Sequence, residues 1–318
     1  MASHPTSDWY RMTVALMAGV VAAMLIGKFP PNLSIIQNEF QISSALAGTM
    51  AAIFNIIGAL FGALTGAYSD RLPPRRMIKF GMLALIAEGL LGAMANDVFV
   101  MLASRVLGGF GFIAVIVTVP RLIRFTMHDG DRRFALGLWG TFMPTGIVLG
   151  MLLNMAMVDV GDWRALWLVI AGLQFVYFVF FTIVFREPLR HEAELGGQSP
   201  LKGLAEAASV PQSWLLAVTF TCYTIQWFTI MIWLPTLMHD LFGKATLWIG
   251  LGTAAVIGGN IIGNVMGTYY LKHFHHRFFL ILFAFLSLTI VMVLTFHVVD
   301  NPLGKLALMF LFSAMVFT

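Results

Sequence analysis

The stretch GALFGALTGAYSDRLPPRR, residues 58–76, decides how this chain is organised, because its outline occurs a second time. The second copy is GNIIGNVMGTYYLKHFHHR, residues 259–277, and the offset is 201 residues, since 259 − 58 = 277 − 76 = 201. Each copy has three glycines spaced four apart before a basic cluster: Gly58, Gly62 and Gly66, then Gly259, Gly263 and Gly267. Such glycines give a helix a smooth face on which another helix packs closely. We predict helix packing at both sets and two parallel, repeated halves.

The composition places both halves in a lipid bilayer. The 318 residues are 59% hydrophobic and 11% charged, with a mean hydropathy of +0.87, whereas soluble chains carry about 25% charged residues. The charged side chains gather in short clusters between apolar stretches of about 20 residues, the length that a helix needs to span a bilayer. The sequence predicts an all-α, polytopic transmembrane helical bundle. The single cysteine, Cys222, excludes an internal disulfide framework.

Hydropathy along the chain predicts about ten spans. They lie near residues 12–37, 43–67, 77–95, 98–121, 134–158, 164–185, 213–238, 245–271 and 278–297, with a tenth beginning near Lys305. Lys and Arg are retained on the cytoplasmic side of a membrane. With the N-terminus inside, 14 of the 19 basic residues fall on that side and three, Arg164, Lys244 and Lys305, fall outside. We expect a bacterial-type inner-membrane protein with a cytoplasmic N-terminus, and no nucleic-acid partner.

A hydrophilic stretch after the sixth span divides the chain. We predict an N-terminal six-helix bundle over residues 1–185, a cytoplasmic linker over 186–212, and helices 7 to 10 of a C-terminal bundle over 213–318. Adding the repeat offset to the end of the sixth span, 185 + 201, predicts a twelfth helix ending near residue 386. We therefore expect a complete protein of roughly 390 to 410 residues, of which this chain is a C-terminally truncated part.

This organisation resembles the major facilitator superfamily, and three motifs carry the resemblance. Gly66, Asp70, Arg71, Arg75 and Arg76 are similar to its loop between helices 2 and 3, although Pro73 and Pro74 stand where the family has one glycine. Arg105 followed by Gly108, Gly109 and Gly111 resembles its fourth-helix motif, and Gly161, Asp162, Trp163 and Arg164 resemble the start of its helix 6. The resemblance implies that the loop residues form a latch that favours one conformational state.

Two segments are most similar to the cyanate and nitroimidazole permease group, Lys28–Pro30 in the first span and Leu138–Gly146 in the fifth. Met143 rather than glycine precedes Pro144, which departs from the Gly-Pro motif of the drug antiporters. The resemblance implies a secondary active transporter that moves a small solute by alternating access. We expect no enzyme activity and no cofactor.

Three charged residues fall inside the predicted spans at matching depth. Glu88 and Arg105 lie 8 and 9 residues from the turn at Asn96, and Lys28 lies 10 residues before Asn38. A charge at mid-membrane costs at least about 2.5 to 3.5 kcal/mol and is expected to be paired or functional. We predict that Glu88 neutralises Arg105 and that Lys28 supplies an excess positive charge for an anionic substrate. Alternatively, Arg105 binds the substrate with Glu88 as orienting partner or proton carrier, or the three charges only lock helices together.

Polar and aromatic side chains of two other spans are further candidates for substrate contacts. They are Trp139, Thr141 and Thr145 in the fifth span and Tyr223, Gln226 and Trp227 in the seventh. The alternative function is proton-driven efflux of a drug or another small molecule, which would use an unpaired acid in the cavity, with Glu88 as the only candidate.

A histidine-rich segment near the end of the eighth span could suggest a metal site. It contains Lys272, His273, His275, His276 and Arg277. The neighbouring cations would repel a metal ion, so the segment indicates a basic cytoplasmic loop, and we predict no metal site.

Overall fold

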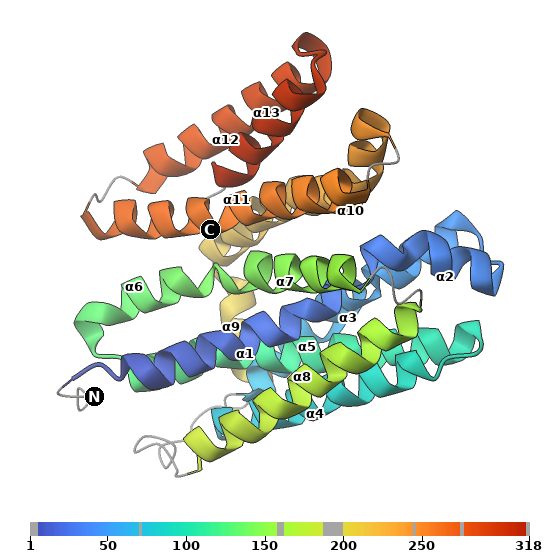
Figure 1. Ribbon diagram of the computed structural model, residues 1–318. Coiled ribbons are helices and arrows are strands. Elements are labelled where there is room, and N and C mark those ends of the chain that lie inside the picture. The colour runs from blue at the N-terminus through green and yellow to red at the C-terminus, as the bar shows by residue number, and fades with distance from the viewer. Residues whose placement is uncertain are drawn as a thin grey trace.

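The computed structural model describes residues 6–69, 72–157, 162–186, 200–243, 246–273 and 277–315, and the described regular structure is helical (Figure 1). The α-helices are α1 (Trp9–Gly27), α2 (Leu33–Phe40), α3 (Ser44–Ser69), α4 (Pro74–Ala93), α5 (Val98–Thr126), α6 (Asp129–Trp139), α7 (Phe142–Ala156), α8 (Trp163–Val184), α9 (Pro200–Ser209), α10 (Pro211–Phe242), α11 (Thr246–His273), α12 (Arg277–Val293) and α13 (Pro302–Ala314). A π-helical turn, Leu294–Val298, follows α12.

Seven helices of the described ranges are long and apolar enough to cross a membrane. Two of them join consecutive elements, α1 with α2 and α6 with α7, and Leu282–Val298 and Pro302–Ala314 are shorter apolar helices. The helix α4 is not one of these seven, because it carries several charged residues, among them Lys79 and Glu88. The predicted polytopic helical bundle is therefore confirmed.

Two predicted spans are interrupted. The first breaks after α1, where Lys28 and Phe29 lead into a 3-10 turn at Pro30–Asn32, because Pro30 and Pro31 have no backbone N–H to continue the helix. The Asn32 side chain donates to the freed Lys28 carbonyl at 2.9 Å. The fifth span breaks at Gly140 and Thr141, between α6 and α7.

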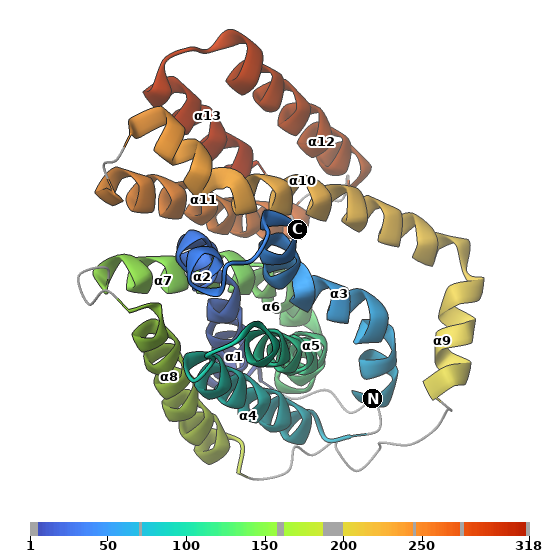
Figure 2. The same ribbon diagram turned by 90° about the vertical axis from the view of Figure 1, so that its right-hand side faces the viewer.

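The helices form two layers. In Figure 2, α10 to α13 stack on one side of the group formed by α1 to α8. The repeat is visible in the packing, because α3 packs on α5 in the first group as α11 packs on α13 in the second. The two groups meet where α11 lies along α6 and α7.

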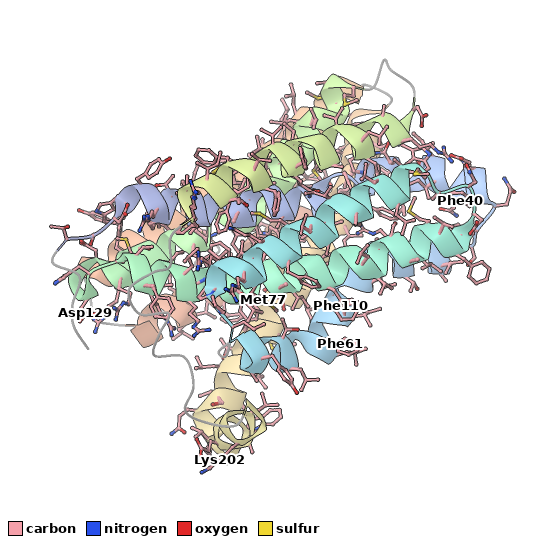
Figure 3. The ribbon with its side chains drawn as sticks, turned by 90° about the horizontal axis from the view of Figure 1, so that it is seen from below. Phe40, Phe61, Met77, Phe110, Asp129 and Lys202 are labelled. Atoms are coloured by element: carbon pink, nitrogen blue, oxygen red, sulfur yellow. The ribbon has the colours of Figure 1, made fainter. Side chains whose placement is uncertain are left out.

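The predicted linker contains a helix. Residues 187–199 lie outside the described residues, but Pro200–Ser209 form α9, with Pro200 at the first helical position that suits proline. This helix packs against α3, and in Figure 3 α9, which carries Lys202, lies below α3, which carries Phe61. The linker thus returns along the first group of helices before α10 begins.

The closest helix contact involves glycines other than the repeated ones. A Cβ atom on Gly146 of α7 would collide with the Val20 carbonyl oxygen of α1, and one on Gly27 would collide with the Ile147 carbonyl oxygen. At the repeated sets, a Cβ on Gly259 would lie 2.9 Å from the Phe310 carbonyl oxygen, whereas one on Gly62 would meet no atom within 4 Å. The backbones of α1 and α7 therefore touch, and Gly62 leaves open space.

The two ends of the bundle differ in charge. The described residues near the start of α1 and the α5–α6 turn are rich in arginine, including Arg121, Arg124, Arg132 and Arg133. We call this the basic end. The opposite end carries acidic residues such as Glu39, Asp97 and Asp162.

Candidate functional site

A cavity of about 800 Å³ lies between the two groups of helices, and we call it the central cavity. Residues from α3, α5, the α6–α7 break, α10 and α11 line it. The cavity takes the middle of α3 and of α10 and, on α5, residues from the middle toward the basic end. Its volume falls in the range that holds small organic molecules.

The lining is aromatic and neutral. Aromatic rings include those of Phe54, Phe112, Trp139, Phe142, Tyr223 and Trp227, and hydrogen-bonding groups come from Asn55, Thr221, Thr224 and Asn260. Among the residues that the structure describes, none of the lining side chains is charged. Ligand recognition here would combine ring contacts with amide and hydroxyl hydrogen bonds.

Three of the predicted substrate contacts line the cavity. The Trp139 ring stacks on Phe142 with centroids 4.0 Å apart and sits against Gly19, where a Cβ would collide with it. The Trp227 ring meets Phe228 edge-on at 5.2 Å, and the Tyr223 ring lies 5.9 Å from that of Phe220, another lining residue.

The other predicted contacts lie elsewhere. The Thr141 and Thr145 hydroxyls donate to the carbonyls of Leu138 and Thr141, at 2.8 and 2.7 Å, so they stabilise the helix break. Gln226 is not in the cavity lining, and its buried Oε1 has no hydrogen-bond donor. Lys28 and Arg105 are also absent from the lining.

The three predicted membrane charges come together in one buried cluster, the charge cluster. The Lys28 Nζ atom lies 2.7 Å from Glu88 Oε2, and an Arg105 Nη atom lies 3.5 Å from Glu88 Oε1. Their side chains are 0%, 0% and 1% exposed for Lys28, Glu88 and Arg105. The predicted contact between Glu88 and Arg105 is present, but Glu88 makes a shorter one to Lys28.

Aromatic rings and backbone carbonyls complete the surroundings of the charge cluster. The Lys28 ammonium lies 4.7 Å from the centroid of the Trp167 ring, and the Arg105 guanidinium lies 4.6 Å from that of Phe29. Arg105 Nε also donates to the Met50 carbonyl at 3.3 Å. Cation–π contacts of this kind stabilise desolvated cations by about 2 kcal/mol.

In depth along the helices, the charge cluster lies at a level between residues that line two cavities. Phe54 of the central cavity follows Met50, the acceptor for Arg105, by one helical turn. A second cavity of about 310 Å³, the side cavity, includes Pro31 and Asn32, which follow Lys28 by three and four residues. Since one turn rises about 5.4 Å, the cluster is about one turn in depth from lining residues of each cavity.

Several residues that line the central cavity were not predicted as substrate contacts. Asn55 and Asn260 provide amide groups in the two glycine-rich helices, and Phe54, Phe112 and Phe228 supply rings. A polar amide in an apolar span is itself a signal of function, so Asn55 and Asn260 could have been found. The phenylalanines carried no such signal among the 28 in the chain.

Asn264 links the two groups of helices beside the central cavity. Its Nδ2 donates to the Gly140 carbonyl at 3.2 Å, which the break between α6 and α7 leaves free, and to Asn260 Oδ1 at 2.8 Å. The cavity amide of Asn260 is thereby joined to the contact between the groups.

Replacing Asn264→Ala should destabilise the protein by about 1 to 3 kcal/mol, because the partly buried Gly140 carbonyl and the buried Asn260 side-chain oxygen lose a donor. The matched control is Thr289→Ala, which removes an exposed hydroxyl bonded only to its own helix and should change stability by less than about 0.5 kcal/mol. Thermal unfolding in detergent measures both. Equal melting temperatures for the two variants would show that this link between the groups carries no stability.

The predicted latch is described in part. Asp70 and Arg71 lie outside the described residues, and Gly66 lies near Val117 of α5. Arg75 donates to the Arg186 carbonyl at 2.8 Å at the end of α8, and Arg121 donates to the Leu72 carbonyl at 3.4 Å. These contacts tie the loop to its own group of helices, and the latch remains a prediction.

The motif at the start of α8 forms a clamp at the end opposite the basic end. Arg164 contacts both oxygens of Glu39, at 2.5 and 3.2 Å, and Trp163 Nε1 donates to the same carboxylate at 2.7 Å. Arg164 also donates to the Ala95 carbonyl at 2.8 Å. The end of α2, the start of α8 and the α4–α5 turn are therefore held together.

The fold and the cavity define a polytopic helical membrane protein built from two groups of helices around a central site. Residues 15–318 match the model of the Major Facilitator Superfamily, and the chain belongs to this family. The structure of the proton:xylose symporter XylE bound to 6-bromo-6-deoxy-D-glucose matches with a TM-score of 0.73 at 14% identity, over 97% of this chain and 79% of that one. This similarity shows a shared fold.

This chain aligns with only part of the length of two curated relatives. The "Probable sulfoacetate transporter SauU" of Cupriavidus necator is 20% identical over 247 residues, 73% of this chain and 57% of the relative. "Multidrug resistance protein 1" of Bacillus subtilis is 27% identical over 139 residues, 44% of this chain and 36% of the relative. The chain thus spans less than two thirds of either relative. The relative from Cupriavidus necator is named as a probable transporter and the structural neighbour as a symporter, so neither is an enzyme.

Proposed function

We propose that this protein is a secondary active transporter that moves a small organic anion by alternating access, through the central cavity. The basic end faces the cytoplasm of a bacterial cell, in line with the retention of basic residues on that side, so the cavity is on the inward side. The similarity of Lys28–Pro30 and the fifth span to cyanate and nitroimidazole permeases supports a small solute.

One observation carries the substrate class: Phe54 in the wall of an uncharged cavity follows by one helical turn the Met50 carbonyl that accepts from Arg105, a member of a buried cluster of two cations and one anion. At roughly 8 Å and an effective dielectric constant of about 20, one excess charge attracts a monoanion by about 2 kcal/mol. The same charge repels a cation equally, and the described lining offers no carboxylate to offset that repulsion. The similarity to a probable sulfoacetate transporter supports the same class.

Uptake of radiolabelled sulfoacetate into proteoliposomes tests the proposal, with competition by a panel of small sulfonates and carboxylates. Saturable uptake that anions inhibit and neutral analogues of equal size do not is the expected result. Trp227→Ala should reduce this uptake at least about tenfold, because the ring is a buried part of the cavity wall. Leu216→Ala on the same helix is the matched control, since Leu216 is 69% exposed and outside the lining.

The second candidate is efflux of a neutral drug-like molecule. The aromatic lining and the volume of the central cavity favour it, as does the similarity to a multidrug resistance protein. Inhibition by neutral aromatic compounds with no response to any anion of the panel would favour this function over anion transport.

A further inference from the structure

The charge cluster contains two cations and one anion, and all three are buried away from solvent. Lys28 and Arg105 both contact the single carboxylate of Glu88, and all three side chains are at most 1% exposed. When each group is ionised, the net charge is +1. Burying a net charge in an apolar bundle is expensive unless it is compensated.

Only one member of the charge cluster can remove that excess by exchanging a proton. The guanidinium of Arg105 does not release its proton in proteins. If Glu88 took up a proton, the cluster would carry +2. Lysine is the basic side chain that gives up its proton in buried sites, and neutral Lys28 would leave a balanced Glu88–Arg105 pair.

Among the described residues, Lys28 has two charged neighbours. Glu88 of α4 and Arg105 of α5 are the ionisable groups that face it in the described structure, and α8 faces it with the Trp167 ring. Asn32, which binds its carbonyl, joins it to Asn154 of α7 at 2.7 Å, and both are uncharged.

Lys28 also lies where a proton could be exchanged with either side. Asn32 lines the side cavity one turn beyond Lys28, and Phe112 lines the central cavity one turn beyond Gly108, against which the Glu88 side chain packs. Both cavities are large enough to hold water. Proton exchange with the side cavity would pass Asn32, and exchange with the central cavity would pass the Glu88 carboxylate, which contacts the Lys28 ammonium.

We propose that Lys28 is the proton-carrying residue of the transport cycle, an inference that rests on the proposed anion transport. On one side a water-borne proton adds to the Lys28 amine and forms the ammonium, and on the other side an N–H bond breaks and the proton returns to water. The protonated cluster attracts the anion and the neutral one does not. At the separation considered above, each ligand should tighten binding of the other by about 30-fold. One proton then accompanies one monoanion, and transport is electroneutral.

Trp167 offers a readout that needs no substrate. An ammonium 4.7 Å from the ring centroid perturbs indole fluorescence, and an amine at that place does so much less. The chain has eight tryptophans, so the Trp167 signal is obtained as the difference between each protein and its Trp167→Phe counterpart. We expect this difference signal to show a single one-proton step when the purified protein is titrated over about pH 5 to 10.

Two substitutions at Lys28 test the assignment. Lys28→Met should fold, because it leaves the Glu88–Arg105 pair balanced, and should lose the step. Lys28→Arg keeps a permanent charge and should also lose it. A step that persists unchanged in Lys28→Met, or its absence from the wild-type protein, would overturn the proposal. The elution profile on gel filtration confirms that each variant is folded.

Transport assays separate this inference from the proposed function. With a small monoanionic sulfonate such as methanesulfonate as probe, wild-type proteoliposomes should accumulate it along an inward proton gradient without a membrane current, and Lys28→Met should lose the accumulation. A fluorescence step without any anion transport would reject the proposed substrate class but retain a protonated Lys28. Proton-driven accumulation by Lys28→Met would reject Lys28 as the proton-carrying residue and would leave the proposed anion transport standing.

Discussion

Glu88→Gln should be the most damaging single substitution in the charge cluster, with a loss of about 3 to 5 kcal/mol of stability, because two buried cations lose the one carboxylate that the described residues place against them. Glutamine keeps the shape of the side chain and one acceptor oxygen but supplies no charge. The expected result is a strong drop in folded protein after detergent extraction and a lower melting temperature of what remains. Glu88→Asp, which retains the charge, is the control and should be affected less.

Second substitutions show whether the charge itself is responsible. Adding Lys28→Met to Glu88→Gln should restore much of the lost stability, since Lys28 makes the shorter contact with the carboxylate, at 2.7 Å against 3.5 Å for Arg105. Adding Arg105→Gln instead should also rescue, but it removes the hydrogen bond to the Met50 carbonyl. Additive losses in these double variants would mean that the cluster is not held by charge neutralisation.

Gly146→Leu should prevent α1 and α7 from packing as they do. Even the Cβ atom would collide with the Val20 carbonyl oxygen and lie 2.6 Å from the Ala23 Cβ, so the helices must separate. Overpacking of this kind costs about 1 to 3 kcal/mol and more where backbone atoms must move. We expect little folded protein, or a melting temperature lower by at least about 5 °C.

Gly62→Ala is the matched control for Gly146→Leu, with Gly146→Ala as the intermediate step. A Cβ on Gly62 meets no atom within 4 Å, so this variant should stay within about 0.5 kcal/mol of the wild-type stability. Thermal unfolding followed by gel filtration compares the three. Wild-type behaviour of Gly146→Leu would mean that the close α1–α7 contact is not needed for folding.

The sequence predicted the helices and the meeting of the charges for simple reasons. Apolar runs of about 20 residues report spans directly. Depth along a helix follows from its fixed rise per residue, so Lys28, Glu88 and Arg105 could be placed at one level before their partners were known. Which cation lies nearer the Glu88 carboxylate depends on how each helix is rotated about its own axis. The depth of a residue in the membrane does not determine that rotation.

Other features depended on which helices face each other. Gly27 and Gly146 carry no regular pattern that marks them as partners, whereas the repeated glycines stood out and yet include Gly62, which faces open space. The helix α9 was read as linker because polar residues and glycines precede it, although its sequence PLKGLAEAAS is rich in good helix formers. Asn260 was not predicted to line the cavity, because it lies in a mostly apolar span and no aromatic residue lies next to it in the sequence.

The position of the charge cluster between the central cavity and the side cavity has an electrical consequence. Water in the two cavities would carry the potential of each compartment deep into the protein, so the voltage across the membrane would fall mainly over the thin layer that contains Lys28, Glu88 and Arg105. A charge that crosses the whole potential gains or loses about 2.3 kcal/mol per 100 mV. Concentrating that drop over about three helical turns, roughly 16 Å, instead of about 30 Å of hydrocarbon makes the local field about twice as strong there. Small displacements of these three side chains would then be the movements of this protein that respond most to voltage.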